Sequence, residues 1–194
     1  MTEAKYILIH CTDYPRSQMP DQFLACNSWH KDRDFPLSSL NYYIGYHRLI
    51  TGEKNYQARL DNEVGAHCNQ QVNNLSMNVQ SLAVCVGFDG DIELLTTMEY
   101  ALLQKQVWEW QDQYKIPNEN VKFHREFATN KTCPGSLITS AWLKSLLERP
   151  IIIQNIPLKP ILNTCIAQEA EIKDLKAKIS WFQEVFDWIA EKFS

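Results

Sequence analysis

The sequence predicts an α/β fold in which helices flank a central mixed β-sheet, with a long helical appendage at the C-terminus. Short apolar runs typical of buried strands alternate with segments in which apolar residues recur at helical spacing. The 194 residues are enough for one ordinary domain and an appendage. The composition changes after Arg149, which places the expected boundary between residues 1–149 and 150–194.

The first half of the chain is expected to contain three strands and a helix. Residues 5–10 form a β-branched apolar run typical of a buried strand, and residues 22–31 have the apolar spacing of a helix. Two more strands are expected around residues 43–50 and over 56–60, with a turn at Gly52 between them.

The second half is expected to begin with the central strand of the sheet, residues 81–88, which read SLAVCVGF. Thr96 and Glu99 then form a capping-box pattern at the start of a long helix. A short strand is expected over 121–124. A last helix is expected over 134–147, because its first residue is a proline, which is well tolerated at that position.

Residues 150–194 are expected to form a proline-punctuated linker followed by an amphipathic helix. The helix carries apolar residues at the three-four spacing of a heptad seam, namely Ile172, Leu175, Ile179, Phe182, Phe186, Ile189 and Phe193. Acidic residues outnumber lysines along it, which disfavours attraction to anionic lipid. Self-association or docking on the preceding domain is therefore expected, and insertion at a membrane interface is the alternative.

The composition excludes several classes of protein. A net charge of −4 provides no general basic surface, so a nucleic-acid partner is not expected. The six cysteines are scattered singly, which favours a reducing compartment over a disulfide framework. The N-terminal residues lack the pattern of a signal peptide, and no apolar run reaches the ~20 residues that span a bilayer. The sequence predicts cytoplasmic synthesis and no transmembrane segment.

Three residues with metal-binding side chains occupy suggestive positions. His10 and His124 each end an expected strand, and Cys133 lies in the loop that follows. A zinc hydrolase needs about three such ligands and one position left open for water. Taken singly, a histidine at a strand end or a lone cysteine is more often structural. The spacing alone leaves both interpretations open.

Four segments, ILIHCTDYP, IGYHRLITGE, GAHCNQQVNNLSMNVQSLAVCVGF and HREFATNKTCPG, resemble in this order the signatures of the zinc-dependent N-acetylmuramoyl-L-alanine amidases. That family includes phage lysozyme-type amidases, bacterial wall-recycling amidases and peptidoglycan-recognition proteins. The resemblance covers roughly residues 5–147. It implies hydrolysis, by a zinc-activated water, of the amide bond between N-acetylmuramic acid and L-alanine in bacterial peptidoglycan.

The resemblance also assigns roles to individual residues. It implies one Zn²⁺ per chain, held by His10, His124 and Cys133. Tyr46 matches a tyrosine that orients or deprotonates the attacking water. Lys131 matches a lysine that stabilises the developing oxyanion, a role that suits a cation aimed at that oxygen.

Two further residues, His67 and Asn78, match positions at which the family binds substrate. Without the resemblance, His67 would be interpreted as a surface histidine. Asn78 and Ser81 form an Asn-x-x-Ser pattern that a turn before a strand explains equally well. The stretch between His67 and Asn78 is longer than usual in the family. Cys11 lies next to the first ligand, which leaves thiol oxidation or stray metal binding open.

The sequence favours an endolysin of phage or prophage type, because the cysteine ligand is retained together with Tyr46 and Lys131, and no signal peptide is evident. A cytosolic amidase that recycles muropeptides is the alternative enzyme. A non-catalytic peptidoglycan-binding protein is less favoured, because such relatives commonly lose the cysteine ligand.

Overall fold

The computed structural model describes residues 4–19, 21–150, 172–173 and 175–176. Contacts divide the chain into two units, Met1–Glu148 and Arg149–Ser194. The expected linker and most of the expected heptad helix lie outside the described residues. Among the residues that are described, no helix combines the length and the apolar character needed to cross a membrane.

Five strands form the central sheet, in the order β3-β2-β6-β1-β7. Strands β2, β6, β1 and β7 run parallel to one another, whereas β3 pairs with β2 in antiparallel register, so the sheet is mixed as predicted. Strands β4 and β5 form a small separate hairpin. The strands are β1 (Tyr6–Cys11), β2 (Arg48–Thr51), β3 (Lys54–Gln57), β4 (Gln71–Val72), β5 (Leu75–Ser76), β6 (Ser81–Val86) and β7 (Val121–Phe123).

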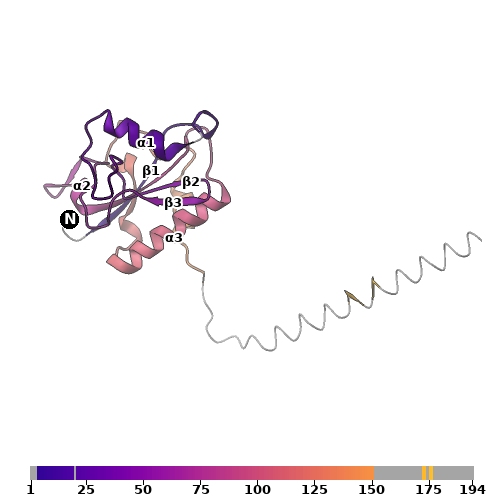
Figure 1. Cartoon of the computed structure of the whole chain (residues 1–194). Coiled ribbons are helices and arrows are strands. Elements are labelled where there is room, and N and C mark those ends of the chain that lie inside the picture. The colour runs from indigo at the N-terminus through magenta and orange to yellow at the C-terminus, as the bar shows by residue number, and fades with distance from the viewer. Residues whose placement is uncertain (1–3, 20, 151–171, 174, 177–194) are drawn as a thin grey trace, which may run out of the picture. The chain divides into compact units, whose positions relative to one another are not determined.

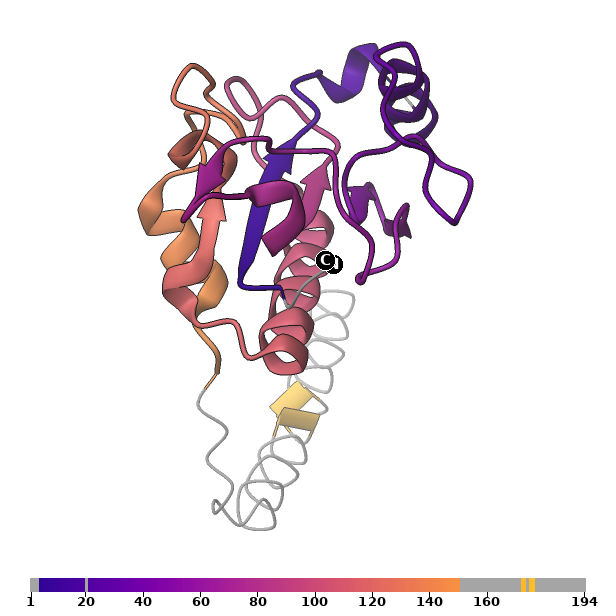
Figure 2. The ribbon, with the colours of Figure 1, turned by 90° about the vertical axis from the view of Figure 1, so that its left-hand side faces the viewer.

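Helices flank this sheet, with α1 on one face and α3 on the other (Figure 1). Strands β1 and β7 run side by side in the same direction, so their carboxyl ends meet at one edge of the sheet (Figure 2). The helices are α1 (Gln22–Lys31), α2 (Met77–Gln80), α3 (Thr97–Tyr114) and α4 (Ser140–Leu147), with 3-10 turns at η1 (Arg16–Gln18), η2 (Asn118–Asn120) and η3 (His124–Glu126).

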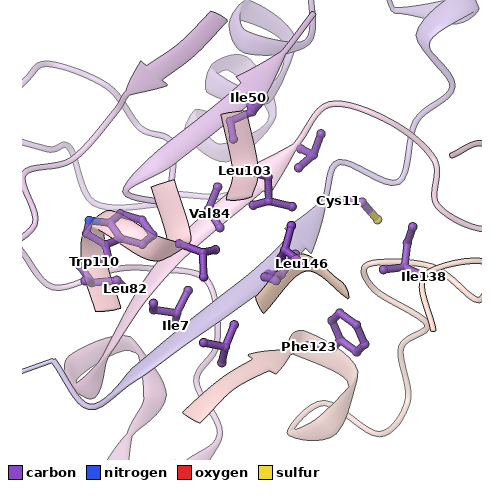
Figure 3. Packing of buried hydrophobic residues seen from close by; sticks show 14 of the residues in the cluster. Ile7, Cys11, Ile50, Leu82, Val84, Leu103, Trp110, Phe123, Ile138 and Leu146 are labelled. Carbon is purple, nitrogen blue, oxygen red and sulfur yellow. The ribbon is translucent and has the colours of Figure 1, made fainter. Parts of the chain in front are cut away.

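Successive side chains of β1 lie on opposite faces of the sheet, one facing the main hydrophobic core and the other carrying His10. Ile7 is 0% exposed and lies in the cluster that contains Leu103 and Trp110 of α3 (Figure 3). Burial of each such side chain contributes about 1.5–3 kcal/mol. Leu8 and His10 project from the opposite face of the sheet, because successive side chains of a strand alternate. The strand therefore packs on α3 with one face and presents His10 on the other.

Most of the predicted elements are confirmed. The strands expected over 5–10 and 81–88 are β1 and β6, and the helix expected over 22–31 is α1. The capping box is also present, because the Thr96 hydroxyl accepts the Glu99 N–H and the Glu99 carboxylate accepts the Thr96 N–H. This reciprocal pair satisfies two backbone donors at the start of α3.

The strand predicted around residues 43–50 is wrong over its first half, because β2 begins only at Arg48. The preceding backbone leaves the sheet to pair with another loop, where the Ala66 N–H donates to the Gly45 carbonyl. A Cβ on residue 45 would lie 2.2 Å from the Ala66 oxygen, so this approach requires glycine. The strand predicted over 56–60 is displaced toward the N-terminus as β3.

The helix predicted over 134–147 is also wrong over its first six residues, 134–139. Helix α4 begins at Ser140, where the Thr139 hydroxyl caps it by accepting the Trp142 N–H. Gly135 has a φ of 108°, which a helix does not allow. The chain between β7 and α4 is therefore largely an irregular loop, and this loop carries Lys131 and Cys133.

Candidate metal centre and its pocket

Three candidate metal ligands come together at the carboxyl end of β1 and β7. His10 lies in β1, His124 directly follows β7, and Cys133 lies in the subsequent loop. Their ligand atoms all lie within 4.8 Å of one another. The ring centroids of the two histidines are 4.4 Å apart, and the Cys133 sulfur lies 3.8 Å from His10 Nδ1. His10 thus meets two residues that lie more than a hundred positions later in the sequence, and we call the three the His-His-Cys cluster.

The electrostatics of the cluster keep both imidazoles neutral. Burial lowers the pKa of His10 well below its usual 6.5, and the positive charge that His124 carries when it is protonated lowers it further. Burial, followed by the charge of Lys131, lowers the pKa of His124 to about 4. A neutral imidazole keeps a nitrogen lone pair that can bind a metal ion.

The sulfur of the cluster has polar contacts of its own. A hydrogen bond with the Cys11 thiol, followed by burial, raises the pKa of the Cys133 thiol well above 9. The Cys11 N–H also donates to the Cys133 sulfur at 3.4 Å. Two imidazoles and one cysteine are the donor set that suits zinc, so the residues present fit this metal.

The two predicted catalytic residues lie beside this cluster. The Tyr46 ring is half-buried, with its centroid 4.9 Å from that of His10. Burial raises the pKa of the Tyr46 hydroxyl well above 10, so the side chain is a neutral phenol. Lys131 is exposed, and its charge lowers the pKa of both His10 and His124. A cation and a hydroxyl group therefore lie on the open side of the two histidines.

A pocket of about 670 Å³ opens above the cluster. It is lined by predicted site residues, including Tyr46, His67 and Lys131. An adjoining pocket of about 340 Å³ shares His67 and Lys131 and also contains Asn78. The predicted site residues other than His10 thus line two adjoining pockets.

The far wall of the larger pocket was missed by sequence reasoning. Tyr14, Trp29, Arg33 and Phe35 line it. The Tyr14 and Trp29 rings lie 4.9 Å apart at an angle of 36°. Trp29 belongs to a helix that was predicted correctly, but its spacing there is equally typical of a packing residue.

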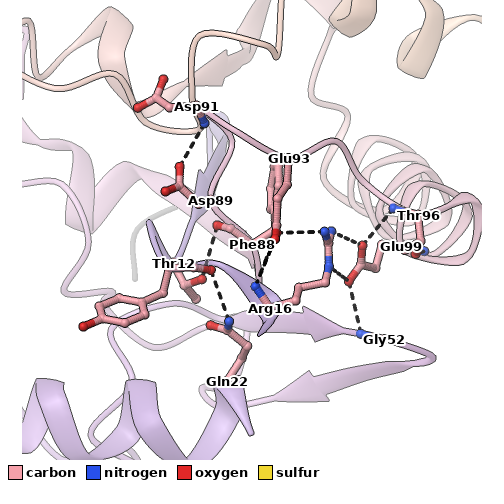
Figure 4. A network of polar contacts seen from close by, with 11 residues as sticks. Thr12, Arg16, Gln22, Gly52, Phe88, Asp89, Asp91, Glu93, Thr96 and Glu99 are labelled. Atoms are coloured by element: carbon pink, nitrogen blue, oxygen red, sulfur yellow. Dashed lines mark hydrogen bonds and ion pairs between the residues drawn. The ribbon is translucent and has the colours of Figure 1, made fainter. Parts of the chain in front are cut away.

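A polar network holds the loop that carries Tyr14 (Figure 4). The Arg16 guanidinium pairs with Glu93 and Glu99, at nitrogen–oxygen distances of 3.0 and 2.5 Å. The Glu99 side chain is fully buried and also accepts the Gly52 N–H. Because the same carboxylate caps α3, the pocket wall is anchored to that helix and to the turn between β2 and β3.

The loop that carries Lys131 and Cys133 is held by Arg125, which sequence reasoning also missed. The Arg125 N–H donates to the Cys133 carbonyl at 2.9 Å. Its guanidinium donates to the carbonyls of Thr132, Gly135 and Ile138, at 3.0, 2.7 and 2.5 Å. The planar fork of donors on arginine suits several acceptors at once.

Asp91 binds the same loop from the other direction. Its two carboxylate oxygens accept the Thr132 hydroxyl at 2.7 Å and the Ser136 N–H at 2.6 Å. These bonds, the Ser136 N–H first, hold the pKa of Asp91 below its usual 3.8. Thr132 lies between Lys131 and Cys133, so this contact fixes the segment that carries both.

Comparison with known proteins gives a consistent result. The sequence model of the N-acetylmuramoyl-L-alanine amidase family matches residues 1–136. A search of curated proteins found no match.

Among solved structures, the chain is similar to the N-acetylmuramoyl-L-alanine amidase LysC from Clostridium intestinale, with a TM-score of 0.57, 20% identity, and coverage of 75% of this chain and 85% of that chain. It is also similar to the Ph2119 endolysin from a Thermus scotoductus bacteriophage, with a TM-score of 0.55, 21% identity, and coverage of 77% and 88%. Drosophila PGRP-LB gives a TM-score of 0.57 at 20% identity, with coverage of 81% and 87%. At such identities the likeness shows a shared fold.

Proposed function

Because the chain belongs to the N-acetylmuramoyl-L-alanine amidase family, we propose that it cleaves the amide bond between N-acetylmuramic acid and L-alanine of peptidoglycan as a zinc enzyme. His10, His124 and Cys133 would hold the metal. The convergence of their ligand atoms within 4.8 Å at the floor of a pocket is the observation that carries this proposal. The proposal assigns the reaction to residues 1–149.

The chemistry divides between the metal and the chain. When bound, zinc acts as a Lewis acid on the scissile carbonyl and lowers the pKa of a water molecule. Lys131 supplies a positive charge beside the cluster, where it stabilises the negative charge that develops on the carbonyl oxygen. The neutral phenol of Tyr46 offers a hydrogen bond that orients the attacking water. The half-buried position of Tyr46 limits its own freedom, which lowers the entropic cost of that alignment.

We further propose that the natural substrate is the polymeric wall, as for an endolysin of phage or prophage type. The support is the cysteine among the ligands, together with the likeness to an amidase and to a bacteriophage endolysin. The hollow over the cluster continues into the adjoining pocket, which suits a substrate that extends on both sides of the scissile bond.

The test is release of free L-alanine amino groups from purified sacculi and, in parallel, from soluble muropeptides. We expect release from sacculi that a chelator abolishes and that one equivalent of zinc restores. The Cys133→Ala variant is the control for contaminating hydrolases. Release from muropeptides but not from sacculi would assign the chain to muropeptide recycling, and zinc binding without release from either would leave it a binding protein.

A further inference from the structure

The two ring nitrogens of His67 both have partners inside the protein, although His67 lines the pocket. Its Nδ1 lies 3.2 Å from His10 Nε2, and its Nε2 lies 3.4 Å from the Ser81 hydroxyl. The Ser81 hydroxyl lies 2.5 Å from the Met77 carbonyl oxygen. Neither ring nitrogen of His67 is therefore left free to form a hydrogen bond with a substrate. The arrangement forms a chain of contacts that ends on one of the candidate metal ligands.

The direction of each hydrogen bond in this series follows from its last acceptor, the Met77 carbonyl oxygen. A carbonyl oxygen can only accept, so the Ser81 hydroxyl donates its proton to Met77. The Ser81 oxygen then accepts from His67 Nε2, which must carry a proton. A neutral imidazole carries a single proton, so His67 Nδ1 is the acceptor and His10 Nε2 is the donor.

Neutrality of His67 follows from its surroundings. Its ring centroid lies 5.1 Å from that of His10 and 6.2 Å from that of His47. It shares both pockets with the cation of Lys131. A positive charge at His67 would lie close to the cation of Lys131 and to two other imidazoles, which disfavours the charged form.

The remaining nitrogen of His10 is then fixed. With its proton on Nε2, His10 has its lone pair on Nδ1. Nδ1 is the atom that lies 3.8 Å from the Cys133 sulfur. The hydrogen-bond chain therefore directs the metal-binding lone pair of His10 toward the other ligands.

The backbone around His67 is held as tightly as its ring. The N–H groups of His67 and Cys68 both donate to the Asn78 side-chain oxygen, each at 2.7 Å. Gly65 lies against the ring, because a Cβ there would be 2.4 Å from His67 Cδ2. The side-chain oxygen of Asn78, a residue predicted to bind substrate, is thus used within the protein to place His67.

We propose that His67 is a positioning residue for the metal site: it selects the His10 tautomer whose Nδ1 binds zinc, and Ser81 in turn selects the tautomer of His67. The proposal rests on the proposed zinc site. Partners behind a ligating histidine typically contribute 10–100-fold to metal affinity, which sets the expected size of the effect.

The first measurement addresses the tautomers without metal or activity. Long-range ¹H–¹⁵N spectra of the full chain at neutral pH, in the presence of chelator, should show His10 protonated on Nε2 and His67 protonated on Nε2. In His67→Phe, which removes the acceptor and keeps a ring, the His10 signal should change to a mixture of tautomers. A wild-type His10 protonated on Nδ1 would overturn the proposal.

The second measurement is zinc affinity, by competition with a chromogenic chelator. We expect His67→Phe to weaken zinc binding by about 10–100-fold. Asparagine and glutamine form a matched pair here: the His67→Asn amide can place its oxygen near the position of Nδ1, whereas His67→Gln reaches toward Nε2. His67→Asn should therefore retain most of the affinity that His67→Gln loses.

These results separate the two proposals. Unchanged zinc affinity in His67→Phe, with only a raised KM, would make His67 a substrate-binding residue and refute the positioning role. A wild-type chain with the expected tautomers that binds zinc without releasing peptide would refute the proposed hydrolysis and leave the positioning role standing.

Discussion

His10 and Cys133 reach the same cluster from two different kinds of backbone. His10 belongs to β1, which is paired with β6 on one side and β7 on the other. Cys133 belongs to an irregular loop that follows η3. Main-chain hydrogen bonds of the sheet place the first residue. The second depends on side chains that bind the backbone of its loop.

The difference shows where the order of the loop comes from. Arg125 and Asp91 together provide the hydrogen bonds that a sheet would otherwise supply, to the segment around Thr132 and Cys133. A ligand on a strand is fixed by the fold itself. A ligand on a loop is fixed by a few polar contacts. Substitutions outside the pocket should therefore disturb the loop residues Lys131 and Cys133 more than they disturb His10 on β1.

Removal of a ligand from either side should give the largest effect. In Cys133→Ala and His124→Ala, two donors of the cluster remain, which is too few for a stable zinc site. We expect both variants to lose zinc and to fall to background hydrolysis of sacculi. Metal content by elemental analysis, measured beside the rate, checks this. Full zinc occupancy in Cys133→Ala would remove this residue from the ligand set.

Substitution of Lys131 tests whether the loop contributes a catalytic charge in addition to the metal ligand Cys133. Lys131→Ala should keep its zinc but lose turnover by about 10²–10³-fold, because it removes a charge that acts mainly in the transition state. The measurement is kcat and KM on a soluble muropeptide, with metal content determined on the same sample. Loss of zinc in this variant would show that Lys131 supports the metal site instead.

Arg125 tests the dependence of the loop on polar contacts. Arg125→Lys keeps the charge but cannot donate to three carbonyls at once, so we expect about a 10-fold loss of activity through a displaced Cys133 and Lys131. The same loss is expected for Asp91→Asn. Asp32→Asn, at the exposed end of α1, is the matched control and should behave as the wild type. Equal activity in all three variants would mean that the loop is ordered by other contacts.

The same comparison explains how much could be predicted from the sequence. Strand positions were predictable because apolar runs such as residues 81–88 carry a direct signal, and His10 and His124 were singled out as the residues that end such runs. The role of Arg125 could not be predicted in this way, because its guanidinium binds backbone carbonyls, which every residue possesses. No pattern of residue types records such contacts.

The start of the last helix was mispredicted for a related reason. Proline at residue 134 is compatible with a helix start and equally with a turn, and the choice depends on tertiary contacts that the sequence does not display. In the structure, Asp91 binds the Ser136 N–H and Arg125 binds the Gly135 carbonyl, so the backbone there is used by the loop. Family resemblance predicted the residues of the candidate site, whereas the side chains that support them could be found only in the fold.

The smallest expected effect on the chemistry of the site concerns its strand side, through His47. Its Nδ1 accepts the Ala83 N–H of β6 and its Nε2 donates to the Glu63 carbonyl, so it acts in the neutral form. Burial lowers its pKa from 6.5 to about 4. Between these values the unfolded chain binds a proton that the folded chain does not, so the free energy of unfolding should fall as the pH decreases from 6.5 toward 4. Each such proton contributes about 1.4 kcal/mol per pH unit to that slope.

The variant His47→Gln isolates this contribution. Urea unfolding in the presence of chelator, repeated between pH 7 and pH 4, should show a flatter pH dependence for the variant than for the wild type, by up to one proton. Other histidines titrate in both proteins, including the buried His30 with a pKa of about 4, so the difference between the two slopes reports His47 alone. Identical slopes would mean that His47 is protonated without cost, and that the contact it makes between β6 and the Glu63 loop survives in acid. The strand side of the site would then tolerate low pH, and any loss of activity there would have to arise at the ligands or in the loop.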